Sequence, residues 1–492
     1  MSLINISNLT FAYDGSYDNI FENLSLQLDT DWKLGFTGRN GRGKTTFLSL
    51  LMGKHSYSGT ISASVHFDYF PFPVPDKSRD TIEVVGEIVP EYVAWRLSRE
   101  FSLLELSEEL LYRPFDTLSN GEQTKVLLAA LFLRDNNFLL IDEPTNHLDI
   151  EGRALVSRYL SSKSGFILVS HDRTFLDNCV DHILSINRAG IDLQKGNFSS
   201  WYYNKQLADS YELAENEKLK KSINHLTKAA KQTAAWSGEV EKTKYATRNS
   251  GLRPDRGYIG HKAAKMMKRA KTTELRRERE VEKKATLLKN IEETENLKIT
   301  PLHYHKERLV LLDDVSICYG DKVVCQGVSF QLRQGQKLAL QGRNGCGKSS
   351  ILKLIKGEDI SFSGRLERGS NLIISYVPQD SSFLRGSLTD YAMQCDIDES
   401  LFKAILRKLD FSRIQFEKDM ENYSGGQKKK VLIARSLCEH ARLYIWDEPL
   451  NFIDVFSRMQ IEELLKQFSP TMLFVEHDRA FCETICSEVV RL

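Results

Sequence analysis

The feature that most constrains this chain is an internal duplication of five short motifs. The two copies keep the same order and lie 304 to 306 residues apart: 304 separate Lys44 from Lys348, and 305 separate Glu143 from Glu448. One matched pair could arise by chance, but five pairs in register indicate two copies of one domain. The 492 residues leave room for two domains of about 200 residues, each with its own core, and a connecting segment.

The first motif of each copy is a glycine-rich loop, GRNGRGKT at residues 38–45 and GRNGCGKS at residues 342–349. Each loop follows an apolar run and opens a helical pattern, which is the context of a P-loop. Backbone N–H groups and the helix N-terminus face phosphate, the lysine reaches the β- and γ-phosphates, and the last hydroxyl ligates Mg²⁺. The pair predicts two ATP sites, and a glycine-rich turn without nucleotide is a poor alternative for a duplicated motif. The predicted nucleotide ligands are Gly38, Asn40, Gly41, Gly43, Lys44, Thr45, Thr46, Gly342, Asn344, Gly345, Gly347, Lys348, Ser349 and Ser350.

Two apolar segments end in acidic pairs, FLLIDEP at residues 138–144 and LYIWDEP at residues 443–449. Buried parallel strands would deliver such acids at their carboxyl ends, where ligands bind in open α/β sheets. Asp142 and Asp447 suit Mg²⁺, together with the hydroxyls of Thr45 and Ser349. Glu143 and Glu448 suit a general base that polarises the attacking water. Adjacent acids at a strand end are often only a helix-capping turn, but their duplication behind a P-loop favours the catalytic interpretation.

A third motif precedes each acidic segment, LSNGEQ at residues 118–123 and YSGGQ at residues 423–427. Each places a serine N-cap before a helix, and alone it would be an ordinary cap. Between a P-loop and an acidic strand, in both halves, it resembles the signature loop of an ATP-binding cassette. The chain therefore resembles an ABC ATPase with two cassettes, which implies an α/β fold for each half.

That resemblance implies further site residues. Tyr13 and Tyr319 match the aromatic residue that stacks on adenine, and His171 and His477 match the switch histidine that contacts the γ-phosphate. Gln379 matches the Q-loop glutamine, a further Mg²⁺ ligand. Residues 146–149 and 451–454 match the D-loops.

The resemblance also implies that each signature helix points its N-terminus at ATP across a dimer interface. The two cassettes of one monomeric chain would then close face to face over two ATP molecules, as a two-state switch. One site would combine Lys44 and Glu143 with Ser424, Gly425 and Gly426. The other would combine Lys348 and Glu448 with Ser119, Asn120 and Gly121.

Two departures break the symmetry of the copies. The first copy has Phe72 where the second has Gln379, judged from the parallel runs YFPF and YVPQ, and a phenyl ring cannot sense Mg²⁺ or water. The first signature has Asn120 where a glycine is usual, and asparagine is bulkier although it tolerates positive φ. Each composite site holds one departure, so the sequence leaves open which site turns over faster.

Composition excludes several classes of protein. No run of 18 apolar residues occurs, and the start MSLINISN lacks the cationic segment of a signal peptide. The eight cysteines form no CxxC pair, and a metal site at Cys482 and Cys486 is a poor alternative to reduced thiols of a cytoplasmic protein. An ABC ATPase without membrane domains could still serve a transporter as a separate subunit.

Residues 206–298 belong to neither cassette. Helical periodicity predicts one long helix over residues 207–236, including Leu207 and Tyr211 at near-heptad spacing, and a second over residues 262–297. The two are expected to pair as an antiparallel hairpin with a tip loop at residues 237–260. The predicted domains are therefore residues 1–205, 206–298 and 299–492.

Charge is concentrated in this linker. Residues 218–284 hold 20 Lys/Arg against 7 Asp/Glu, a net charge of +13, although the whole chain carries only +1. A solvated helix pair is the plain alternative, but so one-sided an excess, interleaved with Trp236, Tyr245 and Tyr258, favours a polyanion. A projecting rod fits an RNA cleft, where aromatic residues can stack on unpaired bases.

Two cassettes joined by a basic helical hairpin resemble the ABC-F proteins, and stretches such as residues 165–173 and 443–451 resemble the Lsa-type antibiotic-resistance subgroup. The resemblance implies binding at the tRNA exit site of the ribosome, with 23S rRNA, peptidyl-site tRNA and nearby large-subunit proteins as partners. It also implies a tip that reaches toward the peptidyl-transferase centre and protection from lincosamides, pleuromutilins and streptogramin A. A housekeeping ABC-F translation factor and a transporter or DNA-repair ATPase remain alternatives.

Overall fold

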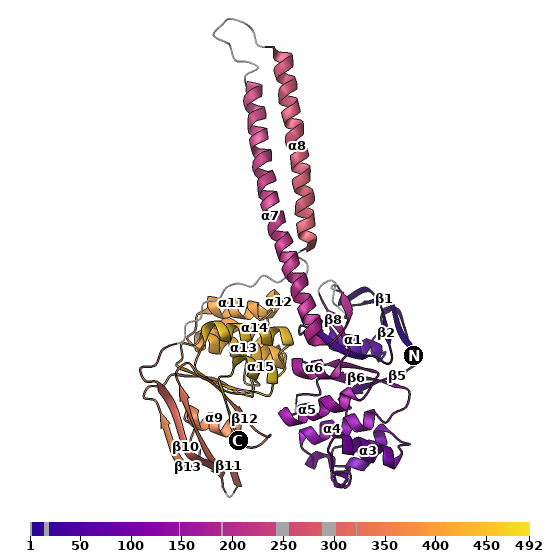
Figure 1. Cartoon of the computed structure of the whole chain (residues 1–492), viewed down its shortest axis with the longest axis vertical. Helices are drawn as coiled ribbons and strands as arrows, with labels where there is room; N and C mark the ends of the chain where they lie inside the picture. The colour runs from indigo at the N-terminus through magenta and orange to yellow at the C-terminus, as the bar shows by residue number, and fades with distance from the viewer. Residues whose placement is uncertain are drawn as a thin grey trace. The chain divides into compact units, whose positions relative to one another are not determined.

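The computed structural model describes residues 2–13, 19–146, 148–187, 190–242, 255–287, 302–320 and 322–492. The chain divides into two compact units, Met1–Ser199 with Thr294–Leu492, and Ser200–Glu293. The first unit holds two α/β cassettes, one from each end of the chain, and the second is helical (Figure 1).

The first cassette is built on a six-stranded sheet in the order β5-β6-β7-β3-β8-β9. Its strands are β3 (Lys33–Gly38), β5 (His66–Phe70), β6 (Asn137–Asp142), β7 (Phe166–Val169), β8 (His182–Ile186) and β9 (Ile191–Lys195). All neighbours pair in parallel except β8 and β9. A smaller antiparallel sheet has the order β2-β1-β4, from β1 (Leu3–Phe11), β2 (Phe21–Asp29) and β4 (Ser58–Ser62). Phe36, Phe47 and Phe138 are fully buried in the apolar core shared by the two sheets.

The helices of the first cassette lie between these strands, and α2, α3 and α4 all lie between β5 and β6. They are α1 (Lys44–Leu51), α2 (Thr81–Ile88), α3 (Ala94–Leu103), α4 (Asn120–Leu131), α5 (Ile150–Ser161) and α6 (Arg173–Cys179). The P-loop connects β3 to the N-terminus of α1. The signature serine, Ser119, is the N-cap residue of α4.

The second cassette repeats this plan. Its parallel sheet has the order β14-β15-β16-β12-β17, and its antiparallel sheet has the order β11-β10-β13. The strands are β10 (Arg308–Tyr319), β11 (Lys322–Arg333), β12 (Lys337–Gln341), β13 (Phe362–Arg368), β14 (Ile374–Val377), β15 (Leu443–Asp447), β16 (Met472–Val475) and β17 (Glu488–Arg491). The helices are α9 (Lys348–Lys356), α10 (Leu388–Gln394), α11 (Glu399–Lys408), α12 (Arg413–Phe416), α13 (Gly425–Cys438), α14 (Val455–Phe468) and α15 (Arg479–Ile485). The matching strand order confirms the predicted fold class.

The linker forms a pair of long helices, α7 (Phe198–Lys242) and α8 (Arg256–Leu287) (Figure 1). The predicted tip loop at residues 237–260 was too long, because α7 continues to Lys242 and α8 begins at Arg256. Gly238, Gly257 and Gly260 lie within these helices, where one glycine costs only about 1 kcal/mol relative to alanine. Residues 243–254 of the predicted tip and residues 288–297 of the predicted second helix lie outside the described residues.

The seam of the pair agrees only in part with the sequence prediction. Leu207 and Tyr211 of α7 are exposed. Leu219, Ile223 and Leu226 of the same helix are half-buried, and Ala263 and Ala270 of α8 are buried, as the helical periodicity indicates. None of the helices in the described part of the chain combines the length and apolarity that a membrane crossing requires.

Candidate nucleotide-binding sites

Each P-loop curls around its own lysine. Lys44 Nζ donates to the carbonyl oxygens of Gly38 at 2.7 Å and Arg39 at 3.2 Å. Lys348 Nζ donates to the matching carbonyls of Gly342 and Arg343, both at 2.8 Å. The two loops thus hold their ammonium groups in the same way, at the start of a helix whose free N–H groups suit phosphate.

Glycine is required immediately before each lysine. Gly43 and Gly347 have φ of 94° and 92°, in the left-handed region. A Cβ at Gly43 would also lie 2.7 Å from Ile20 Cγ2, and one at Gly347 would lie 2.9 Å from Val324 Cγ1. Any larger residue would therefore be strained in its backbone and would displace a neighbour.

The predicted adenine-binding tyrosines lie beside the P-loop helices. Tyr13 shares a 2.9 Å hydrogen bond between its hydroxyl and Thr46 Oγ1, and the Tyr319 hydroxyl donates to Ser350 Oγ at 3.3 Å. Both rings are about half exposed, at 45% and 51%. An exposed ring fixed to the P-loop is available for stacking.

The predicted Mg²⁺ residues meet at the strand ends. Asp142 Oδ2 accepts hydrogen bonds from Thr45 Oγ1 at 3.3 Å and from the Tyr69 hydroxyl at 2.9 Å. In the second cassette Asp447 is buried, which raises the pKa of its carboxyl group. Its Oδ1 has no hydrogen-bond partner among the described residues. A buried carboxylate oxygen without a donor, beside the Ser349 hydroxyl, suits a divalent cation.

The two glutamates that follow these aspartates share an unusual backbone. Glu143 and Glu448 have φ of 51° and 46°, a left-handed conformation that non-glycine residues seldom adopt outside functional sites. Their N–H groups donate to Val169 O at 2.9 Å and Val475 O at 3.0 Å, and these bonds fix the turn. Each carboxylate approaches its predicted switch histidine. The distances are 3.3 Å from His171 Nε2 to Glu143 Oε1 and 3.6 Å from His477 Nε2 to Glu448 Oε1.

The surroundings of the two glutamates differ. Glu448 Oε2 accepts from Gln379 Nε2 at 2.8 Å and from Asn451 Nδ2 at 2.7 Å. Burial alone would raise the pKa of Glu448, but the His477 imidazole and these two amides lower it to about 2. Glu143 Oε1 is buried without a hydrogen-bond partner in the described part of the chain. Burial, reinforced by neighbouring Asp142, raises the pKa of Glu143 to about 8.

Both sites draw on both cassettes. A cavity of about 640 Å³ is lined by residues of the first P-loop, by Glu143 and His171, and by Ser424, Gly425 and Gly426 of the second signature. A cavity of about 1150 Å³ is lined by residues of the second P-loop, by Gln379, Glu448 and His477, and by Ser119, Asn120 and Gly121 of the first signature. The structure places these predicted sets around two cavities. Gly38 lies outside the lining of the first cavity, and Gly342, Tyr319 and Asp447 lie outside the lining of the second.

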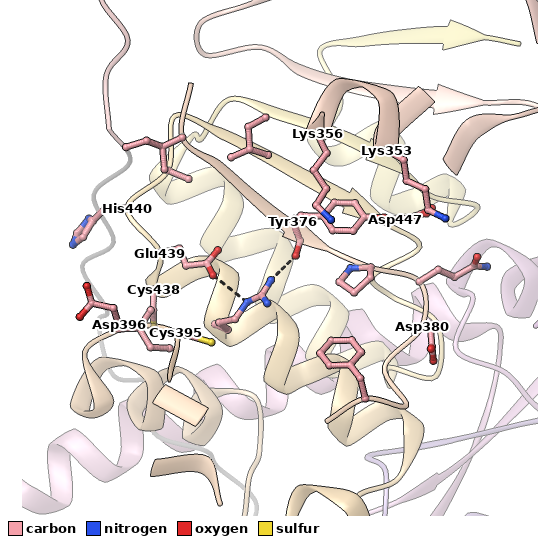
Figure 2. A pocket seen from close by; sticks show the side chains of 18 of the residues that line it. Lys353, Lys356, Tyr376, Asp380, Cys395, Asp396, Cys438, Glu439, His440 and Asp447 are labelled. Carbon is pink, nitrogen blue, oxygen red and sulfur yellow. Dashed lines mark hydrogen bonds and ion pairs between the residues drawn. The ribbon is translucent and has the colours of Figure 1, made fainter. Parts of the chain in front are cut away.

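A third cavity of about 1090 Å³ adjoins the second site and is lined by Ser349, Gln379 and Asp447 among others. Figure 2 shows Asp447 near Tyr376, Lys353 and Lys356, with Cys395 on the far side of the same cavity. Lys356 Nζ lies 4.6 Å from the centre of the Tyr376 ring. The buried acid of the second site therefore also adjoins a cavity that both acidic and basic side chains line.

Close contacts join the cassettes at the first site. Asn40 Nδ2 of the P-loop donates to Phe452 O of the other cassette at 2.8 Å. A Cβ added at Gly426 would lie 2.3 Å from the same oxygen, within its own cassette, and 3.1 Å from Asn40 Nδ2 of the other cassette. Ser424 and Gln427 cap this signature helix reciprocally, as Ser119 and Glu122 cap the other.

A buried arginine network at the interface was missed in the sequence. Arg153 NH1 donates to Asp172 Oδ2 at 3.0 Å and to His477 O of the other cassette at 3.2 Å. Arg458 NH1 donates to Asp478 Oδ2 at 2.8 Å. The signal was present, because these pairs also recur at offsets of 305 and 306 residues.

Known proteins share this organisation. A family model described as ABC transporter matches residues 21–146 and 325–451, just over half of the chain. The ribosome protection protein VmlR of Bacillus subtilis (strain 168) is 28% identical over 490 residues, which cover 98% of this chain and 85% of VmlR. The ATP-binding protein Uup of Buchnera aphidicola subsp. Acyrthosiphon pisum (strain APS) is 27% identical over 510 residues, which cover 98% of this chain and 79% of Uup.

Solved structures share the fold. The archaeal ribosome recycling factor aABCE1, in complex with the ribosomal stalk protein aP1, matches with a TM-score of 0.64 and 19% identity, over 98% of this chain and 87% of that chain. The chain belongs to the ABC transporter family, and it is an ATP-hydrolysing protein of the double-cassette ABC-F type.

Proposed function

We propose that this ATPase binds the ribosome and protects it from antibiotics of the large subunit. The observation that carries the proposal is the basic helical pair between the two cassettes. Helix α8 alone has 11 Lys/Arg against 4 Asp/Glu. Lys262, Lys265, Lys268, Arg269 and Lys271 are all exposed on it. Such a surface binds phosphate backbones and releases counterions.

The ribosome is the proposed polyanion because the relative VmlR carries the name ribosome protection protein. In the ATP state the chain would occupy the tRNA exit site, against 23S rRNA, peptidyl-site tRNA and nearby large-subunit proteins. The linker would extend toward the peptidyl-transferase centre, where lincosamides, pleuromutilins and streptogramin A act. Binding there would place the protein in the cytoplasm, as a monomer whose cassettes pair within one chain.

ATP would drive the cycle through the two composite sites. Lys44 and Lys348 would bind the β- and γ-phosphates, and the opposite signature helices would face the γ-phosphate with their N-termini. Glu143 and Glu448 would accept a proton from the attacking water. Cassettes that close on ATP and open after hydrolysis would couple turnover to release from the ribosome.

Mg²⁺ fits the same sites. Thr45 and Asp142 would hold it in the first, and Ser349, Asp447 and Gln379 in the second. When bound, the ion neutralises charge on the β- and γ-phosphates. Oδ1 of Asp447, which has no hydrogen-bond partner among the described residues, supports this assignment.

The first experiment tests whether a Glu143→Gln/Glu448→Gln variant co-sediments with ribosomes. This variant is called the trap, because it should bind ATP without hydrolysing it. We expect the trap to bind ATP with near-normal affinity and to pellet with ribosomes only when ATP is present. Its turnover should fall about 100-fold or more, because the water loses its base. A Lys44→Ala/Lys348→Ala variant is the control, since it should fail to bind ATP and to pellet.

Two outcomes would redirect the proposal. Near-normal ATPase activity of the trap would remove both glutamates from catalysis, and absence from the ribosome pellet would favour a transporter subunit or a DNA-repair ATPase. A drug-susceptibility test of cells that express the wild-type chain then separates the two ribosomal functions. A ribosome-protection protein would allow growth in the three drugs, whereas a translation factor would leave drug susceptibility unchanged.

A further inference from the structure

Lys429 is a buried lysine on the second signature helix that lines neither of the two ATP-site cavities. Helix α13 begins at Gly425, so Lys429 lies one turn beyond the residues that complete the first ATP site. Its side chain is only 2% exposed. Its Nζ donates to the carbonyl oxygens of Pro378 at 3.0 Å and of Glu448 at 3.1 Å. Pro378 directly precedes Gln379, so this ammonium group contacts the backbone at both partners of the Gln379–Glu448 hydrogen bond.

A buried ammonium group is costly unless it is well compensated. Burial lowers the pKa of Lys429, and the carboxylates of Glu476, Asp447 and Glu448 oppose that shift. An apolar side chain of similar length would fill this space without the desolvation cost. The charge is therefore better explained by the two carbonyl groups it holds than by packing.

The first cassette lacks the whole arrangement. Thr124 occupies the position of Lys429 in α4 and is also buried, but its side chain is too short to span the same distance. Pro71 and Phe72 stand where the second cassette has Pro378 and Gln379. The long cation thus occurs in the cassette that has an amide to position, and it is absent from the cassette that does not.

We propose that Lys429 is a positioning residue that fixes Gln379 and Glu448 of the second ATP site and ties them to the helix that completes the first site. Movement of α13 when its N-terminus engages ATP at the first site would reach Glu448 through this lysine. The inference rests on the proposed catalytic role of Glu448.

The test measures the turnover of each ATP site separately, in a chain whose other site has been inactivated. In a Glu143→Gln background, turnover reports on the second site, and Lys429→Met should lower kcat by about 10- to 100-fold through misplacement of the base. The KM for ATP should stay within about twofold, because no phosphate contact is lost. Lys429→Arg should restore most of the activity, since guanidinium can donate to both carbonyls. Lys428→Met, the same change on a partly exposed neighbour, should have no effect.

In a Glu448→Gln background, which reports on the first site, Lys429→Met should change kcat by less than about twofold. Equal losses in both backgrounds would mean general damage to α13, and an unchanged kcat in the Glu143→Gln background would mean that Lys429 does not position the second site. Either result overturns the inference. Persistent turnover in the Glu143→Gln/Glu448→Gln chain would instead overturn the catalytic role of the glutamates themselves.

Discussion

Gln379 donates a 2.8 Å hydrogen bond from Nε2 to Oε2 of Glu448, whereas Phe72 brings no donor to Glu143 at the matching position. An oriented, ionised glutamate can accept a proton at once, while a buried glutamate with a raised pKa must first lose its own proton. The two sites of this ATPase are therefore built unequally, and the difference lies in side chains rather than in the fold.

Loss of the Gln379 amide should slow the second site selectively. In the Glu143→Gln background we expect Gln379→Leu to lower kcat about 10-fold, because a hydrogen bond to a charged group contributes roughly 1.5–3 kcal/mol. Phe72→Leu in the Glu448→Gln background is the matched control and should change little. Phosphate-release assays of both single-site chains provide the measurement. If Glu143→Gln removes more of the total turnover than Glu448→Gln does, the second site is not the faster one.

Gly426 should tolerate no side chain where the cassettes meet. Gly426→Ala places a Cβ 2.3 Å from Phe452 O, so we expect first-site turnover in the Glu448→Gln background to fall about 10-fold, as misplacement in a composite site predicts. Stability of the isolated helix should not suffer, because alanine favours helix over glycine by roughly 0.5–1 kcal/mol. Gly86→Ala, in a helix with open space around the new methyl group, controls for the helix effect. Full first-site activity of Gly426→Ala would show that Phe452 moves away when the site closes.

The sequence predicted those parts of the site that local chemistry dictates. P-loop glycines, serine caps and acids at strand ends each depend on a short contiguous segment of the chain, so they can be identified without tertiary information. The arginines and aspartates of the buried network recur in both copies of the sequence. Their pairing, the contacts of Lys429 and the cross-cassette contact from Asn40 depend on which residues the fold brings together, and no local pattern encodes that. Helix bounds in the linker were predicted less well, because single glycines weaken a helix without ending it.

The Arg153–Asp172 pair should matter for both stability and cassette closure. Both side chains are nearly buried, at 10% and 5% exposure, and removal of one partner from a buried pair typically costs about 3–5 kcal/mol. We expect Arg153→Met to lower the denaturation midpoint and also to reduce ATP-dependent ribosome binding, since the contact with His477 O is lost. Arg96→Met is the control, because its pair with Asp135 is exposed and worth under about 1 kcal/mol. Equal midpoints for the two variants would contradict a structural role for Arg153.

The linker should separate into a binding part and a protecting part. Deletion of residues 243–258 removes the whole connection between α7 and α8, together with the first three residues of α8, but leaves most of the basic surface. We expect that chain to hydrolyse ATP and to pellet with ribosomes in ATP, yet to lose drug protection in growing cells. Protection that survives the deletion would assign drug displacement to the cassettes and their occupancy of the exit site.

Charge neutralisation on α8 should have the opposite effect, because phosphate contacts position a protein on RNA. Lys265, Lys268, Arg269 and Lys271, all exposed, would be changed together to glutamine. Ribosome affinity of this variant should fall, and the slope of its logarithm against log salt should flatten by up to about 3.6, at roughly 0.7–0.9 per lost phosphate contact. Glu274→Gln with Glu278→Gln, on the same helix, should instead tighten binding. An unchanged salt slope in the neutralised variant would mean that α8 does not face rRNA, and the proposed binding mode would then have to place the phosphate contacts on the cassettes.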